Sequence, residues 1–223
     1  MTFKLYHGSE KIIERPQFGL GSIANDYGRG FYLTESPELA GEWACKNNCD
    51  GFINAYELDT KGLKICDLNS GDYNILNWLA VLTKYRGYWQ KRSIAEEAKD
   101  YLQKHFTVDL SVFDIVRGYR ADDSYFSFAQ DFIMGTISLQ QLNAAFQLGK
   151  LGEQIVLKSQ KAFERISYLG HTEADAAMYY SSKLVRDKKA RKDYAAYRAA
   201  GKRTDEIYII DILRGRDIED ACL

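Results

Sequence analysis

Three short segments carry side chains of the types that act on small molecules: residues 5–9 (LYHGS), 27–34 (YGRGFYLT) and 152–157 (GEQIVL). They contain His7, Tyr32 and Glu153, and Trp43 follows Tyr32 by eleven positions. Histidine can exchange a proton near neutral pH, and aromatic rings can stack on a planar ligand. A carboxylate can stabilise a developing positive charge. The three segments are therefore candidates for one ligand site.

Each of these residues also has a purely structural explanation. A histidine at a strand end is most often a hydrogen-bonded structural group, and a tyrosine in an apolar strand usually packs in the core. Trp43 can anchor a helix to the core, and a glutamate that opens a strand is usually solvated. The order of the residues and the sequence around them favour a shared site.

Hydrophobic periodicity assigns the first candidates to defined elements. The alternation of Phe3, Leu5 and His7 with Lys4 and Tyr6 predicts a short first strand that ends in the small residues Gly8 and Ser9. Ser36 and Pro37 are typical of a helix start, with serine as the N-cap and proline at the first helical position. Trp43 should lie on that helix.

The other periodic segments alternate irregularly between strand and helix, which indicates an α+β fold. Strands are predicted over residues 30–33, 52–58, 63–68, 112–117, 153–157 and 207–213. Helices are predicted over residues 75–82, 93–102, 126–133 and 138–146, and over a basic segment that ends at Gly201. We expect one domain over residues 1–223, with a core over residues 1–169 and a basic helical extension with a closing strand over residues 170–223.

In their order and their local sequence, the three segments resemble the motifs of the His-Tyr-Glu class of ADP-ribosyltransferases, which includes diphtheria toxin and the poly-ADP-ribose polymerases. In those enzymes one strand ends in His-Gly-Ser, a later strand contains the tyrosine, and a second aromatic residue follows it by eleven positions. The catalytic glutamate opens a further strand. The positions that match are His7, Gly8, Ser9, Tyr32, Trp43 and Glu153. The YHGS and GFYLT wording is similar to that of an uncharacterised bacterial branch of the superfamily.

The resemblance implies a split sandwich of two small antiparallel sheets around an NAD cleft, with helices inserted between residues 70 and 150. It implies a mono-ADP-ribosyltransferase that uses NAD⁺ as co-substrate, releases nicotinamide and modifies an acceptor. The acceptor, whether protein, nucleic acid or small molecule, stays open, as does a role as toxin, defence factor or regulator. The alternatives are an NAD⁺ glycohydrolase, a non-catalytic NAD- or ADP-ribose-binding module and a nucleic-acid-binding module.

The resemblance also implies a role for each aromatic and acidic residue. Cleavage of the nicotinamide–ribose bond passes through an oxocarbenium-like state, which a nearby anion stabilises. Glu153 would supply that anion, while Tyr32 and Trp43 would hold the nicotinamide between their rings. Gln154 stands where the polymerases have tyrosine. Because the broader class accepts Glu, Asp or Gln at the third site, Gln154 is an alternative to Glu153 there.

The polar contacts implied for the ligand come from the first segment. Gly8 would offer its backbone N–H and C=O to the carboxamide, since it has no Cβ to block close approach. His7 would hydrogen-bond the adenosine ribose, assisted by Ser9. Two positions depart from known relatives. Ala40 replaces a serine that contacts the carboxamide in the polymerases. Leu151 replaces the Glu or Gln of the arginine-modifying enzymes, which disfavours an arginine acceptor.

The bulk composition makes several classes of protein unexpected. The net charge of −1 gives no electrostatic reason to expect a nucleic acid or a membrane as partner. No apolar run approaches the roughly 20 residues that span a bilayer, and the N-terminus lacks a signal-peptide pattern. We therefore expect a cytoplasmic protein. Four cysteines are too sparse for a disulfide scaffold and their spacing suits no zinc site, so no metal is expected.

One segment departs from this balance. Residues 183–203, which begin at Lys183 and end at Arg203, carry nine Lys or Arg against two Asp. The segment is rich in alanine, which favours a helix. With Tyr194 and Tyr197 among its cations, such a helix can contact the phosphates and bases of a nucleic-acid acceptor. A solvated basic helix beside an acidic body is the alternative explanation.

Overall fold

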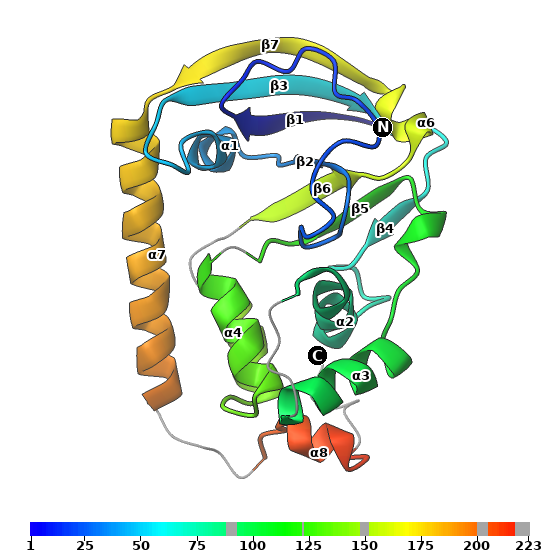
Figure 1. Ribbon diagram of the computed structural model, residues 1–223, viewed down its shortest axis with the longest axis vertical. Coiled ribbons are helices and arrows are strands. Elements are labelled where there is room, and N and C mark those ends of the chain that lie inside the picture. The colour runs from blue at the N-terminus through cyan, green and yellow to red at the C-terminus, as the bar shows by residue number, and fades with distance from the viewer. Residues whose placement is uncertain (88–92, 122, 148–151, 200–204, 217–223) are drawn as a thin grey trace.

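The computed structural model describes residues 1–87, 93–121, 123–147, 152–199 and 205–216. Within these ranges, two small sheets and eight helices form an α+β fold (Figure 1). The first sheet is antiparallel throughout and has the order β1 (Thr2–Ser9), β3 (Gly51–Asp59), β7 (Ile166–Ala174). The second sheet has the order β2 (Phe31–Leu33), β6 (Glu153–Leu157), β5 (Ile115–Tyr119), β4 (Ile65–Asp67).

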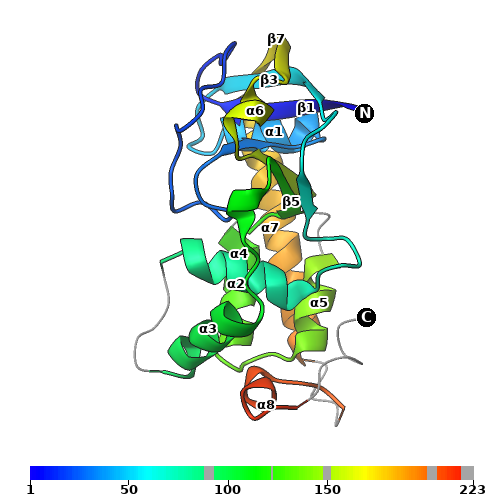
Figure 2. The same cartoon turned by 90° about the vertical axis from the view of Figure 1, so that its right-hand side faces the viewer.

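Apolar side chains from the facing surfaces of the two sheets form one part of the core. Leu5 and Tyr56 of the first sheet pack there with Ile155 and Leu157 of the second, and all four are buried. The other surface of the second sheet packs against helices and contributes Val116 to the largest apolar cluster. Figure 2 shows this order from the side, with the first sheet at one end, the helices at the other and the second sheet between.

Most helices belong to the helical layer that packs against the second sheet. These are α2 (Ile75–Tyr85), α3 (Ile94–His105), α4 (Asp123–Ile133), α5 (Leu139–Gln147) and α8 (Ile209–Leu213). The short α6 (Gln160–Phe163) joins β6 to β7. Helix α1 (Pro37–Ala44) instead packs on β1 and β3 of the first sheet. Its start matches the prediction, because the Ser36 hydroxyl accepts a hydrogen bond from the Leu39 N–H and Pro37 is the first helical residue.

One backbone bridge brings the two sheets together. Tyr6 of β1 and Thr34, just after β2, exchange both of their backbone hydrogen bonds, at 2.8 and 2.9 Å. The bridge is isolated, so β1 and β2 are paired only at this position. The residues that follow Tyr6 in β1 therefore lie close to β2 but do not continue this backbone pairing.

The predicted α+β class and the two small sheets are confirmed, but three details of the prediction are wrong. The second sheet is mixed, because β4 and β5 run parallel. The strand predicted over residues 112–117 begins only at Ile115, since a 3₁₀ turn (Leu110–Val112) capped by Asp109 comes first. The strand predicted over residues 207–213 is the helix α8.

Local capping explains the helix at this last position. The Tyr208 N–H donates to the Asp211 carboxylate at 2.9 Å, which satisfies one of the backbone groups at the helix start. Ile209 and Ile212, three residues apart, are both buried on one face. The short apolar run therefore follows a helical period, although it is compatible with either element.

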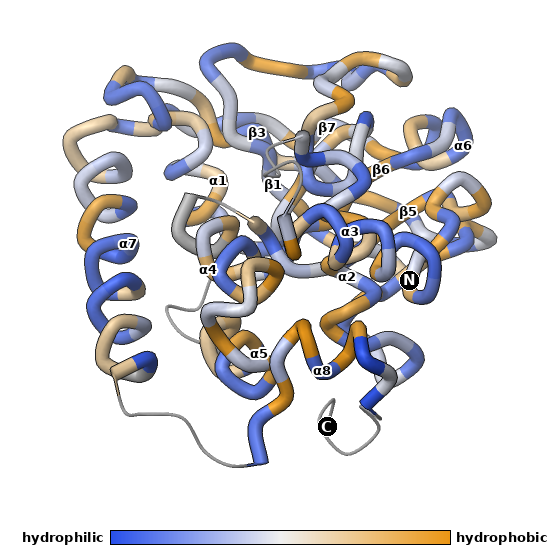
Figure 3. The backbone as a smooth tube through the Cα atoms, turned by 60° about the horizontal axis from the view of Figure 1, so that its bottom comes forward, coloured by the Kyte–Doolittle hydropathy of each residue, from blue (hydrophilic) through white to orange (hydrophobic). Residues whose placement is uncertain are grey.

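The C-terminal extension is also arranged differently from the prediction. The boundary expected at residue 169 falls inside β7, so the first sheet includes part of the extension. Helix α7 (Ala176–Ala199) begins seven residues earlier than the basic segment and packs against α1, α4 and α5. Figure 3 shows α7 as mostly hydrophilic along one side of the molecule. None of the helices in the described ranges has the length and apolar character needed to cross a membrane.

Candidate functional site

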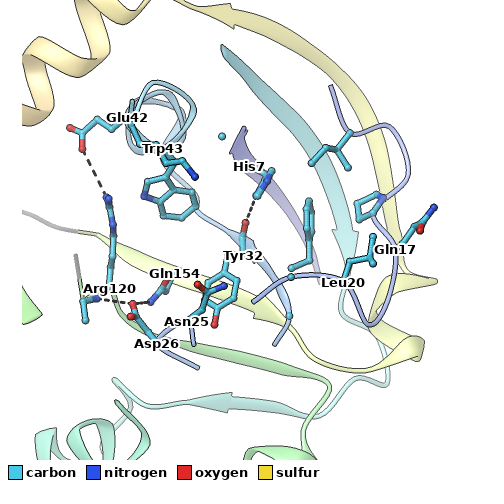
Figure 4. Close-up of a pocket in the computed structure, with 18 of the residues that line it drawn as sticks. His7, Gln17, Leu20, Asn25, Asp26, Tyr32, Glu42, Trp43, Arg120 and Gln154 are labelled. Atoms are coloured by element: carbon cyan, nitrogen blue, oxygen red, sulfur yellow. Dashed lines mark hydrogen bonds and ion pairs between the residues drawn. The ribbon is translucent and has the colours of Figure 1, made fainter. Parts of the chain in front are cut away.

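A cavity of about 560 Å³ brings residues of all three segments together beside the Tyr6–Thr34 bridge. Its lining includes His7 of β1, Tyr32 of β2, Trp43 of α1 and Gln154 of β6. Figure 4 shows the side chains of His7, Tyr32 and Trp43 gathered around one space. The volume is in the range of small-molecule sites. The fold therefore brings together positions 147 residues apart in the chain.

The Tyr32 hydroxyl fixes the turn that precedes β2. It donates to the Gly28 carbonyl at 2.6 Å and accepts from the Tyr27 N–H at 3.1 Å. Gly28 has φ +72°, a conformation that favours glycine. On the other side of the turn, the Lys158 ammonium donates to the carbonyls of Tyr27 and Arg29 at 2.6 and 2.5 Å. Burial raises the pKa of Tyr32, so the hydroxyl stays protonated and the ring remains as a neutral wall of the cavity.

His7 has a defined tautomer. Its Nδ1 lies 2.7 Å from the Tyr32 carbonyl oxygen, and because a carbonyl only accepts, Nδ1 carries the proton. Burial lowers the pKa of His7, and the positive charge of Lys46 adds to this effect against the opposing hydrogen bond to Tyr32. The imidazole is therefore neutral near pH 7, with Nε2 as a hydrogen-bond acceptor.

Gly8 directs its backbone N–H and C=O toward the free side of β1. Successive residues of an antiparallel strand direct these groups to alternate sides. Because Tyr6 uses both groups to bond Thr34, Gly8 faces the same way two residues later. Glycine is required here by packing, since an added Cβ would lie 1.7 Å from the Ala40 carbonyl oxygen of α1.

Ser9 lies outside this cavity. It lines an adjoining depression together with His7, Gly8 and Trp43. Its hydroxyl donates to the Lys11 carbonyl at 2.5 Å and accepts from the Asn54 amide at 3.1 Å. Ser9 thus helps to hold the loop that follows β1.

Gln154 is buried and its amide is oriented by two hydrogen bonds. The amide nitrogen donates to the Asp26 carboxylate at 2.7 Å and to the Tyr119 carbonyl at 3.3 Å. Asp26 also accepts from the Arg86 guanidinium at 2.8 Å and from the Ala121 N–H at 2.9 Å. With its nitrogen held in this way, the amide oxygen is the Gln154 atom suited to accept a hydrogen bond from a ligand.

Glu153 does not line the cavity. Its carboxylate accepts from the Asn69 amide at 2.7 Å and forms an ion pair and a hydrogen bond with Arg117. Arg117 also pairs with Glu35 at 3.1 Å. Of the two alternatives for the third position, the cavity therefore contains the Gln154 side chain.

Several cavity residues were not assigned by sequence reasoning. Asp26 and Arg86 orient Gln154, and Arg120 lies with its guanidinium carbon 5.2 Å from the centre of the Trp43 ring. Asp26 precedes the YGRG turn directly, which is its one sequence signal, whereas Arg86 and Arg120 depend on long-range contacts. His105 and His171, the other two histidines of the chain, are absent from the cavity lining. The described ranges hold no group of three or more His, Cys, Asp or Glu residues placed to bind a metal.

Comparison with known families adds one finding. Residues 3–168, well over half of the chain, match the family "Protein of unknown function (DUF3990)". The chain belongs to this family. The matched region of this DUF3990 protein contains the residues of the cavity from His7 to Gln154. Neither the curated proteins nor the solved structures contain a match to the chain.

Proposed function

We propose that the protein binds NAD⁺ in this cavity, cleaves the nicotinamide–ribose bond and transfers ADP-ribose to an acceptor. One observation carries the proposal: His7, Tyr32 and Trp43, at positions that match the ADP-ribosyltransferase motifs, line one cavity with Gln154. A cavity of about 560 Å³ flanked by two small sheets is consistent with the split sandwich that this activity implies.

The nicotinamide ring is placed between Tyr32 and Trp43, whose rings supply flat apolar faces. Its carboxamide needs one donor and one acceptor in fixed geometry. The N–H and C=O of Gly8, which face the free side of β1, provide both without side-chain motion. The missing serine at Ala40 leaves Gly8 as the main carboxamide partner in this arrangement.

His7 binds a ribose hydroxyl through Nε2. Because Nδ1 donates to the Tyr32 carbonyl, Nε2 is the acceptor and receives the hydroxyl proton in a hydrogen bond. Neutral imidazole is needed for this role, and the lowered pKa of His7 keeps it neutral. The same contact couples His7 to the backbone of Tyr32, so the two motif residues act as one unit.

Gln154 fills the third position. Its amide oxygen accepts from a ribose hydroxyl and directs a dipole at the carbon that becomes positive as nicotinamide leaves. Asp26 holds the amide nitrogen at 2.7 Å and so fixes this orientation. Glu153 stabilises the strand from outside the cavity through Arg117.

The direct test is nicotinamide release from NAD⁺ by the purified protein. We expect release that exceeds the amount of protein, together with ADP-ribose bound to an acceptor when labelled NAD⁺ is incubated with a cell lysate. Digestion of the labelled fraction with protease or nuclease then identifies the acceptor class.

The same assay distinguishes the alternatives. Free ADP-ribose as the sole product, with or without lysate, would replace transfer by NAD⁺ glycohydrolysis. Calorimetric binding of NAD⁺ without any nicotinamide release would overturn the enzymatic proposal and leave a binding module. Absence of NAD⁺ binding would overturn both.

A further inference from the structure

Cationic side chains outnumber acidic ones among the described residues of the cavity wall. Of the described residues that line it, four side chains are cationic and two are acidic. The cations are Lys46, Arg86, Arg120 and Lys183, and the acids are Asp26 and Glu42. An uneven wall of this kind attracts an anionic group of the ligand.

Ion pairs neutralise both of the carboxylates. Arg86 pairs with Asp26 at 2.6 Å. Arg186 of α7 binds Glu42 through two hydrogen bonds of 3.1 and 2.6 Å. Both carboxylates of the described wall are therefore already engaged by guanidinium groups.

These three cations come from different parts of the chain. Lys46 follows the end of α1, Arg120 follows the end of β5, and Lys183 lies on α7. Their convergence on one cavity differs from the solvated face of a single basic helix. Lys183, the first residue of the basic segment, lines the cavity, so this end of the segment is not simply part of a solvated helix.

Arg120 is buried and is held in place by its neighbours. The residue is 8% exposed, and its guanidinium lies over the Trp43 ring and 3.9 Å from the Glu42 carboxylate. Figure 4 shows it extending between Glu42 and the Asp26–Gln154 pair, beside Trp43. Packing against an aromatic ring holds the planar guanidinium in place, and its fork of donors matches phosphate oxygens.

We propose that Arg120, Lys46 and Lys183 form a subsite for the diphosphate of a dinucleotide, at the end of the cavity next to Trp43. The inference rests on the proposed function for the identity of the dinucleotide, NAD⁺. A diphosphate presents two adjacent anionic groups, and three cations from three elements can contact both. Arg120 supplies the fixed donors, while Lys46 and Lys183 contribute charge from the rim.

The test measures binding by calorimetry and needs no turnover. The ligands are ADP and inorganic pyrophosphate, with adenosine and nicotinamide as uncharged controls. The variants are Arg120→Gln, Arg120→Lys and Lys183→Gln, with Lys188→Gln as the matched control. Lys188 is an exposed cation on the same helix as Lys183 and does not line the cavity.

We expect Arg120→Gln to weaken ADP binding by about ten-fold or more, as for loss of a hydrogen bond to a charged group. Arg120→Lys should recover only part of this loss, because lysine keeps the positive charge but lacks the planar set of guanidinium donors. Lys183→Gln should weaken ADP binding several-fold and reduce its salt dependence. Lys188→Gln should bind ADP as the wild type does, and no variant should change adenosine binding.

Two results would overturn the subsite. One is wild-type affinity for ADP in both Lys183→Gln and a folded Arg120 variant. The other is NAD⁺ binding by a wild-type protein that binds neither ADP nor pyrophosphate. Tight ADP binding that depends on Arg120, without nicotinamide release from NAD⁺, would leave the subsite in place and reject the transferase. Nicotinamide release at the wild-type rate in the Arg120 and Lys183 variants would reject the subsite and leave the transferase in place.

Discussion

Gln154→Met is the substitution that tests the site most sharply. Methionine has a similar length and shape but offers no amide oxygen to a ribose hydroxyl. We expect the variant to bind NAD⁺ with little change in affinity and to release nicotinamide far more slowly. The reason is that a dipole directed at a developing charge stabilises the transition state more than the bound substrate.

The magnitude follows from the contacts of the amide. Loss of one polar group directed at a developing charge lowers the rate about 10²–10³-fold. The substitution also removes the 2.7 Å hydrogen bond to the Asp26 carboxylate, which costs about 1.5–3 kcal/mol of unfolding free energy. Asp26 keeps its contacts with Arg86 and the Ala121 N–H, so its carboxylate stays paired. The folded state should persist, since total stabilities are about 5–15 kcal/mol.

The assay pairs this variant with Glu153→Gln, the neighbouring substitution. Initial rates of nicotinamide release are measured at saturating NAD⁺, and the dissociation constant and melting temperature are measured beside them. Glu153→Gln removes the ion pair with Arg117, which is half-buried and lies outside the cavity, so we expect close to the wild-type rate. A rate that collapses in Glu153→Gln and survives in Gln154→Met would refute the assignment of the third position.

Three further predictions concern other parts of the chain. Trp43→Ala should weaken NAD⁺ binding by about 1–3 kcal/mol in calorimetry, as for loss of a stacking platform; loss of folding in a melting experiment would instead identify Trp43 as a core anchor. Burial lowers the pKa of His7 below its usual value of 6.5, so the folded state resists protonation and the unfolding free energy should fall as pH drops below 6.5. Denaturant titrations at several pH values should show that the unfolding free energy of His7→Asn depends less on pH than that of the wild type. An unchanged pH dependence would contradict this prediction. Finally, neutralising four exposed cations of α7 should leave nicotinamide release unchanged. Transfer should fall, in a salt-dependent manner, only if the acceptor is a nucleic acid. Slower nicotinamide release would contradict the placement of these four residues outside the cavity. The four are Lys188, Lys189, Arg191 and Lys192.

The structure bears on this last prediction through the contacts of the basic segment. Arg191 pairs with Asp187 at 2.8 Å and Lys189 with Asp193 at 2.5 Å, in both cases one helical turn apart. Tyr194 is buried and donates to Asp131 at 2.7 Å, so it is unavailable to stack on a base. The side chain of Tyr197 and residues 200–203 lie outside the described part of the chain. Two of the exposed cations in the middle of α7 are therefore paired within the helix, as on a solvated face, while Lys183 nearer its start lines the cavity.

Sequence reasoning succeeded where the local signal was strong. The Ser36–Pro37 start of α1 and the reciprocal bonds between Ser138 and Gln141 before α5 are contacts between near neighbours. Such caps are determined within one helical turn and can be recognised from a single sequence. The apolar runs of β1, β3 and β6 likewise correspond to strands within a few residues.

It failed where the decisive contacts are distant in the chain. Asp26 binds Gln154 across 128 positions and Ala121 across 95, and no local pattern indicates either contact. The parallel pairing of β4 with β5 is likewise a property of the whole topology. The site needed these long-range contacts to be complete, whereas its motif residues are visible in short segments.

The choice between Glu153 and Gln154 depends on the alternation of a single strand. Side chains of a strand point to opposite faces at successive positions, and directly paired residues share a face. Tyr32 is paired with Val156, so Gln154, two residues before Val156, lies on the face of Tyr32. Glu153 lies on the face of Ile155, which is paired with Arg117, and its carboxylate is bound by that arginine. A motif read as "glutamate at the strand start" cannot distinguish these faces, because both residues belong to the same six-letter segment. The register of β2 against β6 makes the distinction, and it is why the amide, held by Asp26, is the group that lines the cavity.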